Sequence, residues 1–220
     1  MRAEMSRMTP LVVRPLNYAQ PDSRLVDEVV RCLIAGGMVV APTETRYGLM
    51  VRADRNEDLE RMYAIKHRDL NLPTALFVAD LAAATRYGQI TPTAEALANK
   101  FLPGPLTMIL RSVTDWSAPR VSGGKIGLRI SSAPVIQQVL GRVPFPLSAT
   151  SANVSGSGDP VNIEDAVEAF GDGVDLYLDA GPIDGPLSTV VDCSSEPVRI
   201  LRSGAISNEA IAAAAGGTVN

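Results

Sequence analysis

A dense group of small polar side chains follows an apolar run near the middle of the chain. The segment PLSATSANVSG, residues 146–156, offers four hydroxyls and one carboxamide and carries no charge. Small side chains such as Ser151 and Asn153 let a ligand approach the main chain and its hydrogen-bonding groups. A serine- and threonine-rich turn that leads into a helix cap would have the same composition. The segment alone therefore leaves a ligand site and a local turn equally open.

A second polar group, PTETRYG, opens where another buried run ends at Pro42. It places Thr43, Thr45 and Tyr47 in the predicted exit turn, and in α/β proteins ligands commonly bind where strands end. Hydrogen bonds within a polar turn would explain the same residues. On its own, this segment favours the simple turn.

A lysine and an arginine stand at the end of a predicted helix. Leu59, Met62 and Tyr63 form an apolar stripe, and Lys66 falls on the same face one turn later, so it is expected to point into the protein. With Arg68 it would suit a polyphosphate, the lysine as a point charge and the arginine as a planar fork. Cations also complement the dipole at any helix C-terminus, and this pair alone does not exclude that role.

Three further residues stand at strand positions where a charge or hydroxyl has consequences. Ser188 starts one predicted strand and Arg202 ends the next, so both could face one cleft. Arg129 lies within the apolar run KIGLRI, which Lys125 begins, and a charge in such a strand needs a partner or a ligand.

The composition narrows the class of protein. The chain has 220 residues, 46% of them hydrophobic, with a net charge of −4, so any anion site must be local rather than a basic face for nucleic acid. Cys32, Cys193 and the single His67 provide neither a disulfide framework nor a zinc or iron site. Nucleotide-binding P-loop, dinucleotide-binding and nucleophile-elbow motifs are absent from the sequence. No apolar run is long enough to span a membrane, and MRAEMSRMTP lacks the apolar region of a secretory signal, so we expect a cytoplasmic protein.

The elements that would position these residues alternate between strands and helices. Strands are expected at 11–16, 38–42, 73–79, 106–110, 126–130, 174–179, 188–192 and 198–202, and another is expected to run into the polar segment 148–155. Helices are expected at 22–35, 56–68, 91–102, 133–141 and from 208. Asn56 is the expected N-cap of the second helix. Successive strands without an intervening helix at 106–130 and after Val174 predict an α/β fold with a mixed, partly antiparallel sheet and helices packed over it. We expect one domain, residues 11–206, with terminal extensions at 1–10 and 207–220.

Taken in order, these motifs carry a family resemblance. The segments PTETRYGL, LPGPLTMIL, GLRI, SATSANVSG, STVVD and ILRSG, together with Lys66-x-Arg68, resemble the YrdC-like threonylcarbamoyl-AMP synthase family from about Val26 to Gly204. Each motif is weak, but the ordered set is specific, and Lys66, Arg68, Ser151 and Asn153 match the family's signature.

The resemblance implies a single-domain YrdC-like fold with a concave ligand cleft, and a reaction. The family joins L-threonine, bicarbonate and ATP into threonylcarbamoyl-AMP and pyrophosphate. Mg²⁺ accompanies the ATP and no prosthetic group is needed. A tRNA threonylcarbamoyl transferase complex then modifies N6 of adenosine 37, and a weak direct contact with tRNA is expected. The implied ATP-binding residues are Lys66, Arg68, Ser151, Asn153 and Arg202, with the first two catalytic, and the implied threonine-binding residues are Thr43, Thr45, Tyr47, Arg129 and Ser188.

Three positions depart from the family pattern, and they keep other functions open. Asp69, Leu72 and Phe77 stand where the family usually has proline, a second proline and a substrate-side histidine. They make the segment similar to the YciO branch, so the alternative is a YciO-type nucleotide- or RNA-binding protein without threonine-dependent activity. Two further alternatives are a tRNA-handling module using Arg68, Lys125 and Arg129, and a carbamoyl-transfer module of the hydrogenase-maturation type.

Overall fold

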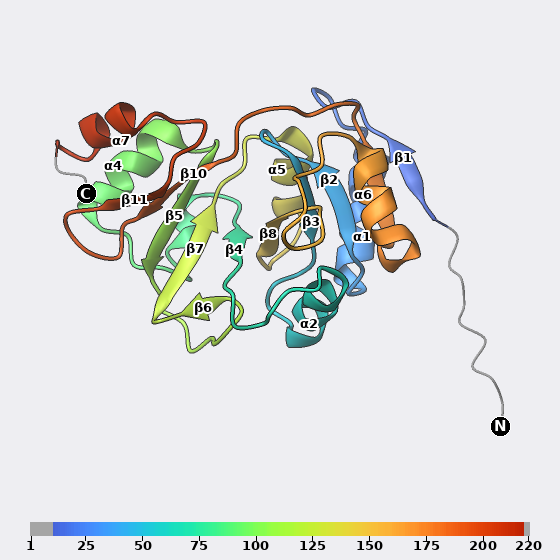
Figure 1. The fold of residues 1–220 in the computed structure, drawn as a ribbon, viewed down its shortest axis with the longest axis horizontal. Coiled ribbons are helices and arrows are strands. Elements are labelled where there is room, and N and C mark those ends of the chain that lie inside the picture. The colour runs from blue at the N-terminus through green and yellow to red at the C-terminus, as the bar shows by residue number, and fades with distance from the viewer. Residues whose placement is uncertain (1–10, 218–220) are drawn as a thin grey trace.

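The computed structural model describes residues 11–217 and shows one mixed sheet covered by helices on both faces (Figure 1). The strand order is β1-β9-β2-β3-β8-β4-β7-β5-β10-β11, with β6 paired to β7. Four neighbouring pairs are parallel (β1 with β9, β2 with β9, β4 with β7, β5 with β10), and the other pairs are antiparallel. The predicted fold class is confirmed. Predictions for residues 1–10 and 218–220 lie outside the described residues.

The strands are short and most of them lie where the sequence pattern predicts. They are β1 Val13–Pro15, β2 Val39–Pro42, β3 Tyr47–Met50, β4 Ala75–Phe77, β5 Leu106–Arg111, β6 Val121–Ser122, β7 Lys125–Arg129, β8 Leu147–Ser151, β9 Leu176–Asp179, β10 Thr189–Asp192 and β11 Arg199–Arg202. Tyr47 begins β3 and is therefore not in the turn where we expected it.

The helices are α1 Ser23–Ile34, α2 Asn56–Ile65, α3 Leu81–Ala84, α4 Pro92–Phe101, α5 Pro134–Leu140, α6 Ile163–Phe170 and α7 Asn208–Ala214. None of the helices within residues 11–217 is both long and apolar enough to cross a membrane. The predicted Asn56 cap is wrong, because Arg55 is the N-cap and Asn56 Oδ1 instead accepts a hydrogen bond from Arg120. Helix α6 was not predicted, although Asn162 caps it by accepting from the backbone N–H of Asp165.

Strand β2 explains why both faces of the sheet are buried. Its side chains alternate between faces: Val39 and Ala41 pack in the core with α1 and α5, whereas Val40 packs with residues of α2, α4 and α6 on the other face. Figure 1 shows α4 and α7 over one end of the sheet and α1 and α6 at the other. Each end thus has its own layer of helices.

Strand β8 joins the two halves of the sheet and positions the predicted site. Its first three residues pair with β4, and its last two, Thr150 and Ser151, pair with Leu49 and Gly48 of β3. The polar segment that follows β8 therefore lies where the strands of the two halves diverge. The end of β2 and the start of β10 reach the same region, because both line one cavity with β8.

Candidate active site

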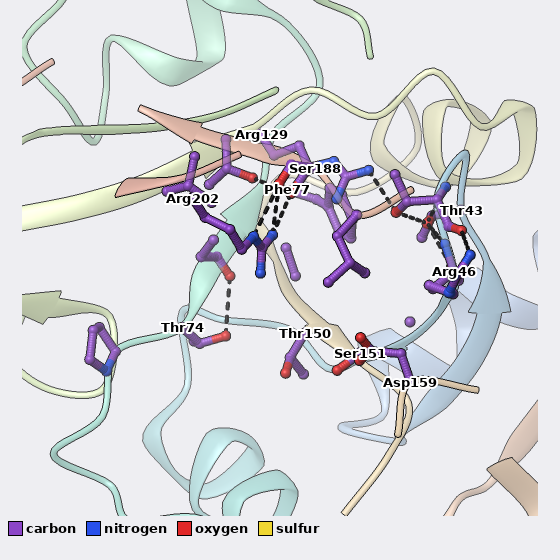
Figure 2. A pocket seen from close by; sticks show the side chains of 18 of the residues that line it. Thr43, Arg46, Thr74, Phe77, Arg129, Thr150, Ser151, Asp159, Ser188 and Arg202 are labelled. Atoms are coloured by element: carbon purple, nitrogen blue, oxygen red, sulfur yellow. Dashed lines mark hydrogen bonds between the residues drawn. The ribbon is translucent and has the colours of Figure 1, made fainter. Parts of the chain in front are cut away.

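A cavity of about 280 Å³ lies between the two halves of the sheet (Figure 2). Its walls come from the β2–β3 turn, β4, β5, the end of β8 and the β10–β11 pair. Eight of the predicted site residues line it: Thr43, Thr45, Tyr47, Arg68, Arg129, Ser151, Ser188 and Arg202. Lys66 and Asn153 are not among the lining residues, and neither is Lys125 of the tRNA-handling alternative.

The β2–β3 turn is held by the hydroxyl of Thr43. Thr43 Oγ1 accepts from the backbone N–H groups of Thr45 (3.1 Å) and Arg46 (3.2 Å) and donates to the carbonyl of Arg46 (2.6 Å). It also lies 3.0 Å from Thr45 Oγ1. The predicted hydrogen-bonded turn is confirmed, and its residues Thr43 and Thr45 also line the cavity.

Arg129 is fixed by a carboxylate that the sequence analysis did not select. Its Nη2 donates to Glu44 Oε1 at 2.8 Å and to Thr45 Oγ1 at 3.1 Å, and the hydroxyl of Ser131 donates to the other oxygen of Glu44. The guanidinium lies 5.5 Å above the ring of Phe77. The expectation that a charge in this strand needs a partner is confirmed, as it is for Lys125, which pairs with Asp192 at 2.8 Å.

Arg202 and Ser188 meet across the β10–β11 pair, as their strand positions predicted. Arg202 donates from Nε and Nη2 to the Ser188 carbonyl at 3.1 and 2.9 Å, and from Nη2 to its hydroxyl at 2.9 Å. That hydroxyl lies 3.1 Å from Thr107 Oγ1 of β5. Figure 2 shows this group facing the cavity opposite Thr43 and Arg46.

Lys66 lies one layer behind the cavity wall. It is 1% exposed, and its Nζ donates to the carbonyls of Ser151 and Asn153 at 2.6 Å each. Burial, with a smaller contribution from the charge of Arg68, lowers the pKa of Lys66 to about 8. The prediction that Lys66 points into the protein is confirmed, and its ammonium holds the backbone of the polar segment after β8.

Asn153 completes this support. It accepts from the hydroxyl of Ser151 and donates from Nδ2 to the carbonyl of Ser157 at 2.7 Å. The backbone N–H of Ser155 in turn donates to the Lys66 carbonyl at 2.9 Å. The segment is thus tied to the end of α2 from two directions, and Ala149, Thr150 and Ser151 of β8 reach the cavity, as does Asp159 further along the chain.

Two arginines border the cavity from opposite sides. Arg68 donates to the carbonyl of Pro73 at 2.7 Å and lies 5.5 Å from the Tyr63 ring centre. Arg46, which the sequence analysis did not select, donates to the carbonyl of Gly185 and pairs with Asp184 at 3.1 Å. It thereby holds the 180–188 segment against the β2–β3 turn.

Tyr47 reinforces the same attachment. Its hydroxyl donates to the carbonyl of Gly181 at 2.7 Å and accepts from the N–H of Ala180 at 3.0 Å. Burial raises the pKa of this hydroxyl, so it stays protonated at neutral pH. The Tyr47 ring lines the cavity while its polar end fixes the connection from β9 to β10.

The arrangement favours binding of an anion by charge and positioning. Four arginines (Arg46, Arg68, Arg129, Arg202) line the cavity together with five hydroxyl side chains or more, although the whole chain is acidic. No cysteine or histidine is among the lining residues, so the described walls supply charge and hydrogen bonds rather than a thiol or imidazole nucleophile. Within residues 11–217 no group of three or more His, Cys, Asp or Glu side chains is placed to hold a metal ion.

The sequence and structure are similar to those of known proteins. The sequence model named Sua5/YciO/YrdC, described as telomere recombination, matches residues 31–204. Threonylcarbamoyl-AMP synthase of Bacillus subtilis is 31% identical over 183 residues, which cover 81% of this chain and 53% of that enzyme. The crystal structure of P. abyssi Sua5 complexed with L-threonine superposes with a TM-score of 0.86 at 26% identity, covering 95% of this chain and 62% of that one. This chain therefore spans about half the length of the B. subtilis enzyme.

YciO of Escherichia coli is also similar to this chain. It is 27% identical over 196 residues, which cover 85% of this chain and 94% of that protein. Similarity thus extends to both branches that the sequence motifs suggested, and the walls of the cavity are what can separate them.

Proposed function

Because this chain belongs to the Sua5/YciO/YrdC family, we propose that it is a threonylcarbamoyl-AMP synthase. It would condense L-threonine, bicarbonate and ATP into threonylcarbamoyl-AMP and pyrophosphate, which is a nucleotidyl transfer. The product would pass to a tRNA threonylcarbamoyl transferase complex for modification of adenosine 37, which is a cytoplasmic task. The similarity to an enzyme of this name and to a threonine-bound structure supports the proposal.

The observation that carries the proposal is the pairing of guanidinium groups with hydroxyls around one cavity. Arg68 and Arg202 supply charge for a triphosphate, and Arg129, with Thr45 beside it, supplies a fork for the carboxylate of an amino acid. An acidic chain that gathers cations at one cavity fits an anionic substrate.

The proposed reaction requires the protein mainly to position its substrates. The amine of threonine attacks the carbon of bicarbonate, and water leaves to give a carbamate. An oxygen of the carbamate then attacks the α-phosphorus of ATP, and pyrophosphate leaves. Positive side chains offset the charge that develops on the phosphate oxygens, and Mg²⁺ arrives with ATP as part of the substrate. We propose that Arg68 and Arg202 contact the phosphates, with Lys66 and Asn153 fixing the wall that carries Ser151.

For threonine we propose Arg129, Thr45 and Ser188 as direct contacts. The hydroxyls of Thr43 and Tyr47 are hydrogen-bonded within the protein, so these residues would act by shaping the β2–β3 turn and the cavity wall. Phe77 lines the cavity at the position where the sequence departs from the family pattern, and its ring packs beneath the Arg129 guanidinium. It would act through Arg129 rather than as a hydrogen-bond partner.

The experiment is pyrophosphate release from ATP and bicarbonate, with and without L-threonine. We compare the native chain with Arg202→Met, which removes a cavity cation, and with Arg199→Met. Arg199 lies on the same strand but is half-exposed and pairs with Asp192 away from the cavity, so it controls for charge loss on β11. We expect threonine-dependent release that falls at least tenfold in Arg202→Met and is nearly unchanged in Arg199→Met.

The opposite outcome would identify the alternative. ATP binding without any threonine-dependent pyrophosphate release would assign the chain to the YciO-type function. RNA binding that weakens steeply with salt and does not depend on threonine would support the tRNA-handling module instead.

A further inference from the structure

Asp159 is the single carboxylate among the side chains that line the cavity. It lies on the segment after β8, past the Ser151 and Asn153 positions, and Figure 2 shows it among the residues around the cavity. The charged side chains that share the lining with it are all arginines. A negative charge in a site that otherwise gathers positive charge calls for an explanation.

The carboxylate of Asp159 is close to the cations of the cavity but is not paired with them. Its charge acts on both Lys66 and Arg202, opposing the effect of burial on the pKa of each. Yet within residues 11–217 it forms no hydrogen bond or salt bridge through its side chain. The other carboxylates near the cavity are engaged: Glu44 by Arg129 and Asp184 by Arg46.

A free carboxylate beside the proposed phosphate site would repel a bare triphosphate. At separations of a few ångströms, two like charges near a protein surface cost on the order of a few kcal/mol. A divalent cation between carboxylate and phosphate reverses the sign of that interaction. Magnesium is usually held this way in nucleotide sites, by one or two carboxylates, the phosphates and water, rather than by a full set of protein ligands.

We propose that Asp159 is the protein's ligand, directly or through a water molecule, for the Mg²⁺ that accompanies ATP in this cavity. The inference rests on the proposed function, since it takes the cavity to be a nucleotide site. It gives the segment after β8 a second task besides carrying Ser151. It also accounts for the lack of a larger group of metal-binding side chains in the described residues, because the phosphates supply most of the ligands.

The test measures binding and not turnover. Titration calorimetry gives the affinity of ATP, without threonine or bicarbonate, for the native chain and for Asp159→Asn, once with Mg²⁺ and once with EDTA. We expect Asp159→Asn to weaken binding of Mg-ATP about tenfold and to strengthen binding of metal-free ATP, because the repelling charge is gone. Glu164→Gln is the control: this carboxylate lies exposed on α6, outside the cavity lining, and its loss should change neither affinity.

The inference requires that Asp159→Asn change the affinities for Mg-ATP and for metal-free ATP in opposite directions. If Asp159→Asn strengthens both kinds of binding, the carboxylate only opposes the charge of the anion and the inference is wrong. If it leaves both kinds of ATP binding unaffected, and a separate titration with L-threonine alone shows weaker binding, the carboxylate receives the amine of the amino acid instead. A native chain that binds no ATP in either buffer would overturn the proposed function itself, whereas native Mg-ATP binding with no difference in Asp159→Asn overturns only the magnesium ligand.

Discussion

At the scale of single residues, Glu44 shows how a buried charge prepares a site. Its two oxygens take hydrogen bonds from Arg129 and Ser131, so the guanidinium is oriented before a substrate arrives. A preorganised fork loses less conformational freedom on binding. In the proposed function, Glu44 therefore acts on the amino acid through Arg129 and is a positioning residue.

We expect Glu44→Gln to raise KM for threonine about tenfold with a smaller change in kcat. The amide keeps the shape but loses a charge-assisted hydrogen bond, worth about 1.5–3 kcal/mol. Steady-state kinetics with varied threonine measure this, and Glu57→Gln, an exposed carboxylate at the start of α2, serves as the control. An unchanged KM would show that Arg129 needs no help from Glu44.

Lys66 leads to a prediction about pH. Its pKa in the folded protein is about 8, below the ordinary value of 10.5, so its charge is lost as the pH rises through about 8. We expect ATP affinity to fall above that pH, and calorimetry at several pH values measures it. Lys66→Met should bind ATP weakly and without this pH step; a step that persists in this variant would have to come from another group.

Unfolding caused by deprotonation of Lys66 would not explain this loss of ATP affinity at high pH. Between about pH 8 and 10.5 the unfolded chain binds more protons at Lys66 than the folded chain does, so the contribution of this lysine to stability rises with pH. Thermal melting of the native chain over the same pH range checks the sign. Binding and stability should therefore move in opposite directions as far as Lys66 is concerned.

For single residues, the sequence predicted the direction of a side chain but not its partners. The helical spacing of Lys66 with Leu59 and Tyr63 correctly predicted that it points inward. Its partners, the Ser151 and Asn153 carbonyls, lie 85 and 87 residues further along the chain. Glu44 stood in a quoted motif, but its contact with Arg129 depends on how β2 and β7 are arranged, which the local pattern does not contain.

At the scale of elements, the close approach of the β10 and β11 ends depends on one glycine. A Cβ on Gly204 would lie 2.3 Å from the carbonyl oxygen of Leu187 and 2.6 Å from the carbonyl carbon of Ser188. Both are backbone atoms, which cannot swing aside. The absence of a side chain at Gly204 therefore sets the position of Ser188 against Arg202.

We expect Gly204→Ala to push residues 187–188 away, to break the Arg202–Ser188 hydrogen bonds and to destabilise the fold by about 1–3 kcal/mol. Chemical denaturation measures the free energy of unfolding, and calorimetry the loss of ATP affinity. Gly141→Ala is the matched control, because a Cβ there meets only the Gln137 and Gln138 carbonyls at 3.4 and 3.8 Å. Equal behaviour of the two variants would contradict the steric argument.

The elements were largely predictable, and the errors have identifiable causes. The alternation of apolar runs with helical periodicities, together with cap residues, predicted most strands and helices. This worked because both faces of the sheet are buried and its strands are strongly apolar. Asn56 was misassigned because Arg120, 64 residues away, takes its side chain. Helix α6 was overlooked although Ile163, Ala166 and Phe170 have helical spacing.

At the scale of the whole molecule, the cavity joins the two halves of the sheet. One wall comes from the β2–β3 turn, β3 and β8 and the other from β4, β5 and β10, so a ligand that fills the cavity would contact both. The sequence predicted which residues would meet, from their order and the family resemblance. It did not predict that eight of them would reach the cavity while Lys66 and Asn153 would lie behind it, since that depends on the packing of β8.

Ligands that bridge the halves should stabilise the entire fold. A ligand at one hundred times its dissociation constant adds about 2.7 kcal/mol, which for a chain of this size raises Tm by about 5–10 °C. We expect this shift with Mg-ATP in thermal melting of the native chain, and a much smaller one at the same concentration in Arg202→Met. A full shift in that variant would place the nucleotide away from β11.

The pairing of β10 with β5 and β11 also has a consequence for how the protein is made. On the ribosome, residues up to β8 emerge while β5 can pair with β7 on one side but still lacks β10 on the other, and an unpaired strand edge invites pairing with other chains. The cavity residues of the β10–β11 region, which include Ser188 and Arg202, leave the exit tunnel after the others. A nascent chain would therefore acquire its proposed substrate affinity only after β11 has emerged, and a chain halted before β10 would be prone to aggregate rather than partly active.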